Sequence, residues 1–93
     1  MSDPNVRFII DRNGHVVQHF VALEELNELS KEILKWLRGR GDDAHLLEEI
    51  ADVQLMLDQL MLMHNFDSGS VEKIKNDKIM RTVERIKGTE HGD

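Results

Sequence analysis

The segment from residue 44 to residue 65 constrains the fold most, because its apolar residues cannot all face one neighbour. At about 100° per residue they form two stripes on nearly opposite sides of a helix. The first stripe comprises Leu46, Ile50, Val53, Leu57, Leu60 and Met61, and the second comprises Leu47, Leu55 and Leu62. A helix that is apolar nearly all round lies at the centre of its assembly. The second stripe therefore predicts a subunit interface, the alternative being that a third helix of the same chain covers it.

The rest of the chain also favours helices. Its one proline is residue 4, and few runs of β-branched residues follow residue 21. Periodicity and stop signals predict three helices, over about residues 15–38, 44–65 and 71–87. One side of the first carries Val16, Phe20, Leu23, Leu26, Ile33, Leu34 and Leu37. We expect an all-α domain at 15–88, an antiparallel helical hairpin plus a third helix that forms a helical bundle on oligomerisation.

Capping residues mark the ends of these helices. Gly39 or Gly41 can take the left-handed position that ends the first helix. Asp42 or Asp43 can cap the second helix, and Ser70 can cap the third. Residues 89–93 are predicted to be a frayed polar tail.

Residues 1–14 form a lead-in with two possible conformations. Residues 6–10 and 15–17 could pair as a short hairpin around the Asn13-Gly14 turn. The favoured interpretation is an extended or disordered segment in which Asn13 caps the helix that starts near Gly14.

The composition excludes several classes of protein. The formal net charge is −6, which argues against a general nucleic-acid binder, because phosphate backbones need a concentrated basic surface. The absence of cysteine excludes disulfides and thiolate metal sites. No secretory leader and no window resembling a membrane span is visible, so a cytoplasmic protein without a membrane partner is expected.

Four carboxylates have a spacing that suits a metal. Glu25 and Glu28 are three residues apart on the first helix, and Glu49 and Asp52 are three apart on the second. Each pair lies on one helix face, so two facing pairs can hold one or two hard divalent cations. Glu49 and Asp52 also flank Val53, at the edge of the first apolar stripe, where burial of charge needs a compensating cation or proton. Glu48 points away together with Gln59. The alternative is that all four are surface acids paired with lysines.

The third helix carries a basic face made of Lys78, Arg81 and Arg85. A cationic face beside a carboxylate–metal cluster suits a polyphosphate, whose distal phosphates need donors that the metals do not supply. The alternative is a solvated stripe that pairs with acids of the first helix.

At these residues the chain resembles a known family. Glu-Glu-Leu-Asn-Glu at 24–28, then twenty residues, then Glu49-Ile-Ala-Asp52 match the E-x-x-E … E-x-x-D signature of MazG-like all-α nucleoside triphosphate pyrophosphohydrolases. Asn76-Asp-Lys-Ile-Met-Arg81 is similar to the family's N-x-K-x-x-R element. The resemblance covers roughly residues 16–87.

The resemblance implies hydrolysis of a nucleoside triphosphate between the α and β phosphates, giving a monophosphate and pyrophosphate. It implies Mg²⁺, with Mn²⁺ as a substitute, held by Glu25, Glu28, Glu49 and Asp52. Lys78 and Arg81 would stabilise charge on pyrophosphate, and Asn76 would add a hydrogen bond. Asn76 lies about 200° from Lys78 on a regular helix, so both contact one nucleotide only across two subunits or on an irregular helix. Family members are dimers or tetramers, so a homodimer or homotetramer is expected.

Two other functions remain open at this point. The chain could be a non-catalytic acidic helical interaction module, whose stability would not respond to magnesium. It could also be a family member that acts on phosphoribosyl-ATP, which the signature does not exclude. A di-iron carboxylate bundle is disfavoured, because no Glu has His three residues later.

Overall fold

The computed structural model describes residues 3–90, with the side chain of residue 90 left out. Within this range the chain forms four helices and no strand: α1 (Pro4–Asn13), α2 (His15–Leu37), α3 (Asp43–Met63) and α4 (Ser68–Glu90). The predicted all-α class is confirmed. Residues 89 and 90 continue α4 instead of fraying, and residues 91–93 of the expected tail lie outside the described range. None of the described helices is long and apolar enough to cross a membrane.

Helix α1 replaces the hairpin or extended lead-in that the sequence suggested. The Asp3 side chain accepts a hydrogen bond from the Asn5 amide at 2.8 Å, and Pro4 occupies the first turn, where its missing N–H costs nothing. The helix buries Ile10 completely. The Asn13-Gly14 pair is therefore a break between two helices and not a strand turn. Gly14 takes a φ of 96° there and is itself the uncapped start of α2.

The turn between α2 and α3 follows the sequence signals closely. Gly39 adopts the left-handed conformation (φ 74°), and the Asp42 side chain accepts from the Ala44 amide at 2.9 Å. Gly41 is needed for a different reason, since a Cβ there would lie 2.7 Å from the Trp36 Cα. The Ser70 cap is wrong. Helix α4 begins at Ser68, so Ser70 already lies within its first turn. The Ser70 amide donates to the Asp67 carbonyl at 3.1 Å.

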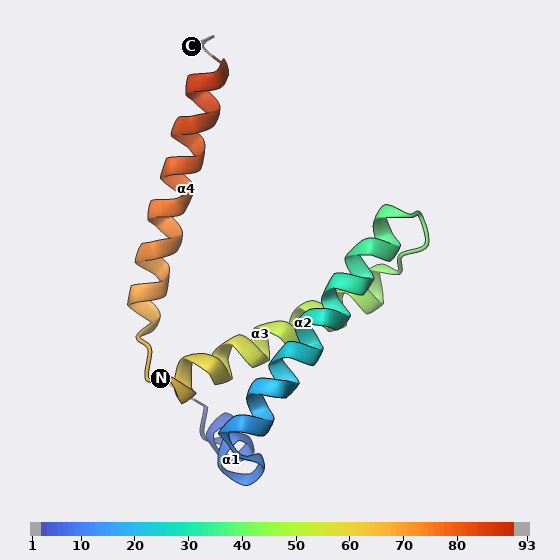
Figure 1. Cartoon of the computed structure of the whole chain (residues 1–93), viewed down its shortest axis with the longest axis vertical. Helices are drawn as coiled ribbons and strands as arrows, with labels where there is room; N and C mark the ends of the chain where they lie inside the picture. Colours follow the sequence, from blue (N-terminus) through green and yellow to red (C-terminus); the bar gives the residue numbers. More distant parts are fainter. Residues whose placement is uncertain (1–2, 91–93) are drawn as a thin grey trace.

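Helices α2 and α3 pack side by side, and α1 closes one end of the pair (Figure 1). The start of α2 meets the end of α3, as the hydrogen bond from Gln18 Nε2 to Gln59 Oε1 at 2.7 Å shows. Both amides are almost fully buried, with 3% and 2% of their surface exposed. Gln59 therefore does not point outward with Glu48, as the helical phase suggested, because a partner amide satisfies it inside.

The contact between α2 and α3 uses the first predicted stripe of α3 only in part, and it does not use the predicted stripe of α2. The buried apolar side chains of the described residues are Ile10, Ala22, Val53, Met56 and Met63. Ile50 and Leu57 of the first predicted stripe are exposed. The whole predicted stripe of α2 is also exposed, and we call it the outer stripe: Val16, Phe20, Leu23, Leu26, Ile33, Leu34 and Leu37. The most apolar surface of α2 thus faces away from α3, because the small and polar side chains Gln18 and Ala22 take the inner face.

Helix α4 extends away from the other three helices (Figure 1). It leaves an apolar face exposed, made of Ile79, Met80, Val83 and Ile86, while Ile74 is exposed on the same side as Lys78 and Arg81. The radius of gyration is 17.2 Å, whereas a compact chain of this length would have about 12 Å. The alternative in which the third predicted helix covers the second stripe of α3 within one subunit is therefore wrong.

Candidate metal centre

Three of the four predicted carboxylates converge between α2 and α3. Glu25 of α2 and Glu49 and Asp52 of α3 each offer one oxygen, and these oxygens lie within 4.8 Å of one another. Glu25 and Glu49 are half-buried, while Asp52 is exposed. Separations of this size allow three oxygens to share one small cation.

The position of the cluster follows from the pairing of the two helices. Residues seven apart lie on the same helix face, two turns away. Glu25 follows Gln18 by seven residues and Asp52 precedes Gln59 by seven, so the buried amide pair sets the register that places these two acids opposite each other. The same register places Glu28 opposite Glu49. The acids therefore belong to the inner face of both helices.

Charge repulsion and burial act on this cluster together. Burial raises the pKa of Glu25, and the neighbouring carboxylates of Asp52, Glu49 and Glu28 raise it further. Burial is likewise the main cause that raises the pKa of Glu49, followed by the charges of Asp52 and Glu28. Both carboxyl groups therefore hold their protons more tightly than an ordinary carboxyl group does, unless a cation lies nearby.

One oxygen of the cluster has no partner. Glu49 Oε2 is buried and makes no hydrogen bond within the described part of the chain. A buried carboxylate oxygen without a donor is costly, and such atoms are rare in folded proteins. The donor set is made only of carboxylate oxygens, which hard cations such as Mg²⁺ and Mn²⁺ prefer. The residues present therefore fit a small divalent cation.

The fourth predicted carboxylate, Glu28, stands beside the cluster without joining it. Its Oε1 accepts from Lys31 Nζ at 3.3 Å, with both side chains largely in solvent. Glu32 lies one turn after Glu28 on the same side of α2 and was not among the predicted site residues. Its side chain is only 12% exposed, pairs with Lys35 at 3.1 Å, and helps to raise the pKa of Glu49. Its spacing of seven residues from Glu25 could have indicated that it lies on the same helix face as the cluster.

The three predicted substrate-binding residues lie on α4, away from the carboxylates. Asn76, Lys78 and Arg81 are all exposed, and α4 does not pack on the α2–α3 pair. Within the described residues of one copy, they are not brought to the cluster. The ion pairs that α4 makes among the residues described, Lys73–Asp77 and Lys75–Glu72, do not involve Lys78 or Arg81.

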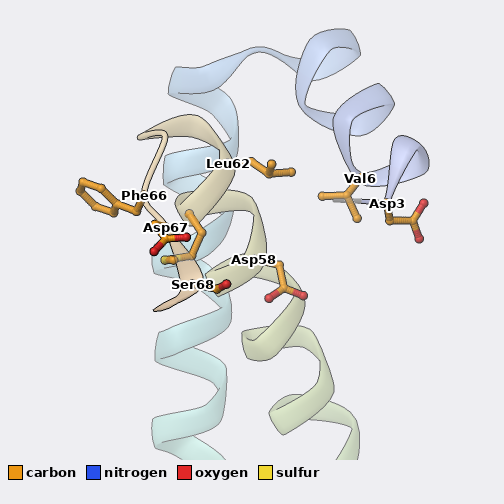
Figure 2. A pocket seen from close by; sticks show the side chains of 8 residues that line it. Asp3, Val6, Asp58, Leu62, Phe66, Asp67 and Ser68 are labelled. Carbon is orange, nitrogen blue, oxygen red and sulfur yellow. The ribbon is translucent and has the colours of Figure 1, made fainter. Parts of the chain in front are cut away.

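A separate hollow of about 460 Å³ lies where α1 meets the end of α3 and the start of α4. Val6 and Leu62 face each other across it, with Asp58 and Phe66 nearby (Figure 2). None of the predicted site residues lines it. We assign no function to this hollow.

Comparison of the chain with protein-family models, with curated proteins and with solved structures gave no match in any of the three. The geometry of the site therefore carries the functional argument.

Proposed function

We propose that the chain is a magnesium-dependent nucleoside triphosphate pyrophosphohydrolase. The observation that carries the proposal is the convergence of Glu25, Glu49 and Asp52 around a buried carboxylate oxygen without a partner. A divalent cation would compensate this charge, and Mn²⁺ would substitute for Mg²⁺. When bound beside a triphosphate, the ion neutralises phosphate oxygens and lowers the pKa of the attacking water.

In this proposal each carboxylate has a defined task. Glu25, Glu49 and Asp52 hold the cation, and Glu28 adds a fourth ligand oxygen by releasing Lys31. That exchange is cheap, because an exposed ion pair is worth about 1 kcal/mol or less. The reaction breaks the bond between the α phosphorus and the bridging oxygen. Water adds to the α phosphorus, and pyrophosphate leaves.

A second copy of the chain would supply the basic residues. We propose that copies associate through exposed apolar residues, including the apolar face of α4 and Leu47 and Leu55 of the second stripe of α3, forming a bundle as a homodimer or homotetramer. Lys78 and Arg81 would then bind the leaving pyrophosphate, and Asn76 would donate a hydrogen bond. Both apolar surfaces are exposed in one copy, and a stable interface needs such surfaces.

The charges of the two parts favour this pairing. Residues 15–63 hold ten acidic and four basic residues, a net charge of −6, whereas residues 68–89 hold three acidic and six basic residues, a net charge of +3. Opposite charges steer one copy onto another and fix the register of the contact.

The test is pyrophosphate release from a panel of standard and modified nucleoside triphosphates with Mg²⁺ or Mn²⁺. The panel includes phosphoribosyl-ATP, so that a dedicated biosynthetic activity is detected as well. We expect release from at least one compound by the wild type and by the neighbouring control Glu48→Gln, and none by Glu49→Gln. If no compound gives pyrophosphate, the hydrolase proposal fails.

The second candidate is a non-catalytic interaction module, which the free apolar face of α4 favours. In that case a partner of another kind covers α4, and the acids are a solvated surface. This candidate predicts that magnesium leaves the melting temperature unchanged, whereas the hydrolase predicts that it rises.

A further inference from the structure

We propose that His19 and His64 form a second metal site, for a transition-metal ion such as Zn²⁺. The two Nε2 atoms lie 2.9 Å apart, and the ring planes meet at 79°. His19 belongs to α2, and His64 is the residue that ends α3. The site therefore lies at the end of the helix pair near α1, separate from the carboxylates.

The ring of His19 is already set as a metal ligand. Its Nδ1 lies 2.6 Å from the backbone carbonyl oxygen of His15, so Nδ1 carries the hydrogen and donates it. The lone pair of the neutral ring is then on Nε2, which faces His64. Histidines that bind metals usually donate their other ring N–H to such a carbonyl or to a carboxylate, and this contact fixes the tautomer.

The ring of His64 is held from the other side. It stacks on Phe66, with ring centroids 5.4 Å apart and planes at 19°. In the metal-free protein one Nε2 must donate a hydrogen to the other, because two lone pairs at 2.9 Å would repel. A cation takes the place of that hydrogen and uses both lone pairs.

The protein ligands of the proposed site are these two rings. His15 precedes His19 by four residues on α2, and both line one hollow on the outer stripe beside Phe20 and Leu23. The ring nitrogens of His15, His19 and His64 do not all lie within ligand distance of one another among the described residues, so water would complete the coordination of the ion. Imidazole nitrogens select zinc, copper and nickel, whereas the carboxylate oxygens select magnesium. The two sites therefore differ in the ion they take.

Such an ion would tie the start of α2 to the end of α3. His19 and His64 are 45 residues apart in the chain, so the link closes a long loop of the unfolded polypeptide. An ion that binds only the folded state stabilises it. The inference does not depend on the hydrolase proposal.

The test is calorimetric titration of the metal-free full chain with Zn²⁺ near neutral pH, with excess Mg²⁺ present to compete at the carboxylates. His91 lies outside the described residues, and it is replaced by glutamine in every protein tested. The variants are His19→Gln and His64→Gln. The matched control is His45→Gln, whose ring is exposed at the far end of α3 beside Asp42.

We expect His19→Gln and His64→Gln each to weaken Zn²⁺ binding at least about tenfold, because each removes one ligand. His45→Gln and Glu49→Gln should bind like the parent. The proposal is overturned if the parent does not bind Zn²⁺, if neither ligand variant weakens it, or if Glu49→Gln weakens it as much.

A second measurement uses the unaltered chain and does not depend on the folding of variants. Cu²⁺ bound to the protein should show nitrogen hyperfine coupling from imidazole in its electron paramagnetic resonance spectrum. A spectrum with oxygen ligands alone would contradict the proposal.

Discussion

The α2–α3 pair and α4 differ in both packing and charge. The pair is held by a buried amide contact and a small apolar core, and it carries an excess of acids. Helix α4 makes no extensive contact with the other described helices of one copy, and it carries an excess of bases. The α2–α3 pair therefore has a buried inner face within one copy, whereas α4 exposes side chains on all sides.

This difference separates the residues of the candidate site from the residues that could stabilise an assembly. Much of the contact between α2 and α3 is made by Gln18, Gln59 and the carboxylates. These polar side chains contribute little hydrophobic stabilisation. The apolar residues that a small domain needs are instead on the outer stripe and on α4. A chain of 93 residues that leaves this much apolar surface exposed would gain stability from association, as the proposed assembly requires. We infer that site and assembly depend on each other.

The largest effect should come from removing one cation ligand of the α2–α3 pair. We expect Mg²⁺ to raise the melting temperature of the wild type. Glu25→Gln and Glu49→Gln should each abolish that rise, because the ion needs oxygens from both helices. Thermal melts with and without Mg²⁺ check this. Glu84→Gln on α4 is the control and should keep the response; an equal response in all four proteins would mean that the cluster binds no ion.

The next effect concerns the apolar face of α4. Val83→Asp places a charge in the proposed contact between copies and should reduce the protein to monomers, because an unpaired buried charge costs about 3–5 kcal/mol. Size-exclusion chromatography with light scattering measures the mass. Lys73→Asp adds the same side chain at an exposed position of α4 that already forms an ion pair, and it should leave the assembly intact. A monomeric wild type would contradict the assembly.

A smaller effect is expected inside the pair. Gln59→Leu removes the acceptor of the buried Gln18 Nε2, while Gln18 Oε1 still accepts from Asn13 Nδ2, and it should lower the free energy of unfolding by about 1–3 kcal/mol. Urea unfolding measures it, with the exposed Gln54→Leu as control. The double variant Gln18→Leu with Gln59→Leu should recover much of the loss, since it removes both polar groups. A loss in the double variant as large as that in Gln59→Leu would mean that the amide pair does not set the register.

The smallest effect is the pH dependence of the metal-free protein. The pKa values of Glu25 and Glu49 are raised in the folded protein. Between the ordinary carboxyl pKa and these raised values, the folded state therefore binds more protons than the unfolded state. The destabilisation is absent below the ordinary carboxyl pKa and grows as the pH rises through the raised values. The melting temperature of Glu49→Gln should therefore exceed that of the wild type at neutral pH, and the gap should close as the pH falls. A gap that is constant with pH would contradict the raised pKa of Glu49.

The sequence predicted the elements and the acid cluster better than it predicted the packing. The three-residue spacing predicted Glu25, Glu49 and Asp52 correctly, whereas Glu28 has the same spacing and does not join the cluster. The sequence left the turn residues open between Gly39 and Gly41 and between Asp42 and Asp43, and the structure uses Gly39 and Asp42. Helical periodicity failed for the inner face, since it assigns burial to the most apolar residues. Gln18 and Gln59 are buried only because they satisfy each other across 41 residues of sequence, which no local pattern reveals.

Two further features were beyond local reasoning for the same physical cause. Asp3, Pro4 and Ile10 make α1 stable by capping and burial, whereas the sequence suggested that residues 6–10 were a strand or an extended segment. The contact of His19 with His64 joins residues from two helices and follows from the tertiary pairing alone. In the proposed assembly the place of Asn76, Lys78 and Arg81 would depend on a partner copy, which the sequence of one chain does not position.

Mixing two inactive variants tests whether the acids of one copy and the bases of another form a single site. Glu49→Gln lacks a cation ligand, and the double variant Lys78→Ala with Arg81→Ala lacks the pyrophosphate donors. Each variant alone should release almost no pyrophosphate. After the two are unfolded together and refolded, half of the dimers should be hybrids with one intact site of two, giving about a quarter of the wild-type activity. If mixed assemblies form but activity does not return, the bases act on their own copy or not at all, and the proposed shared site is wrong.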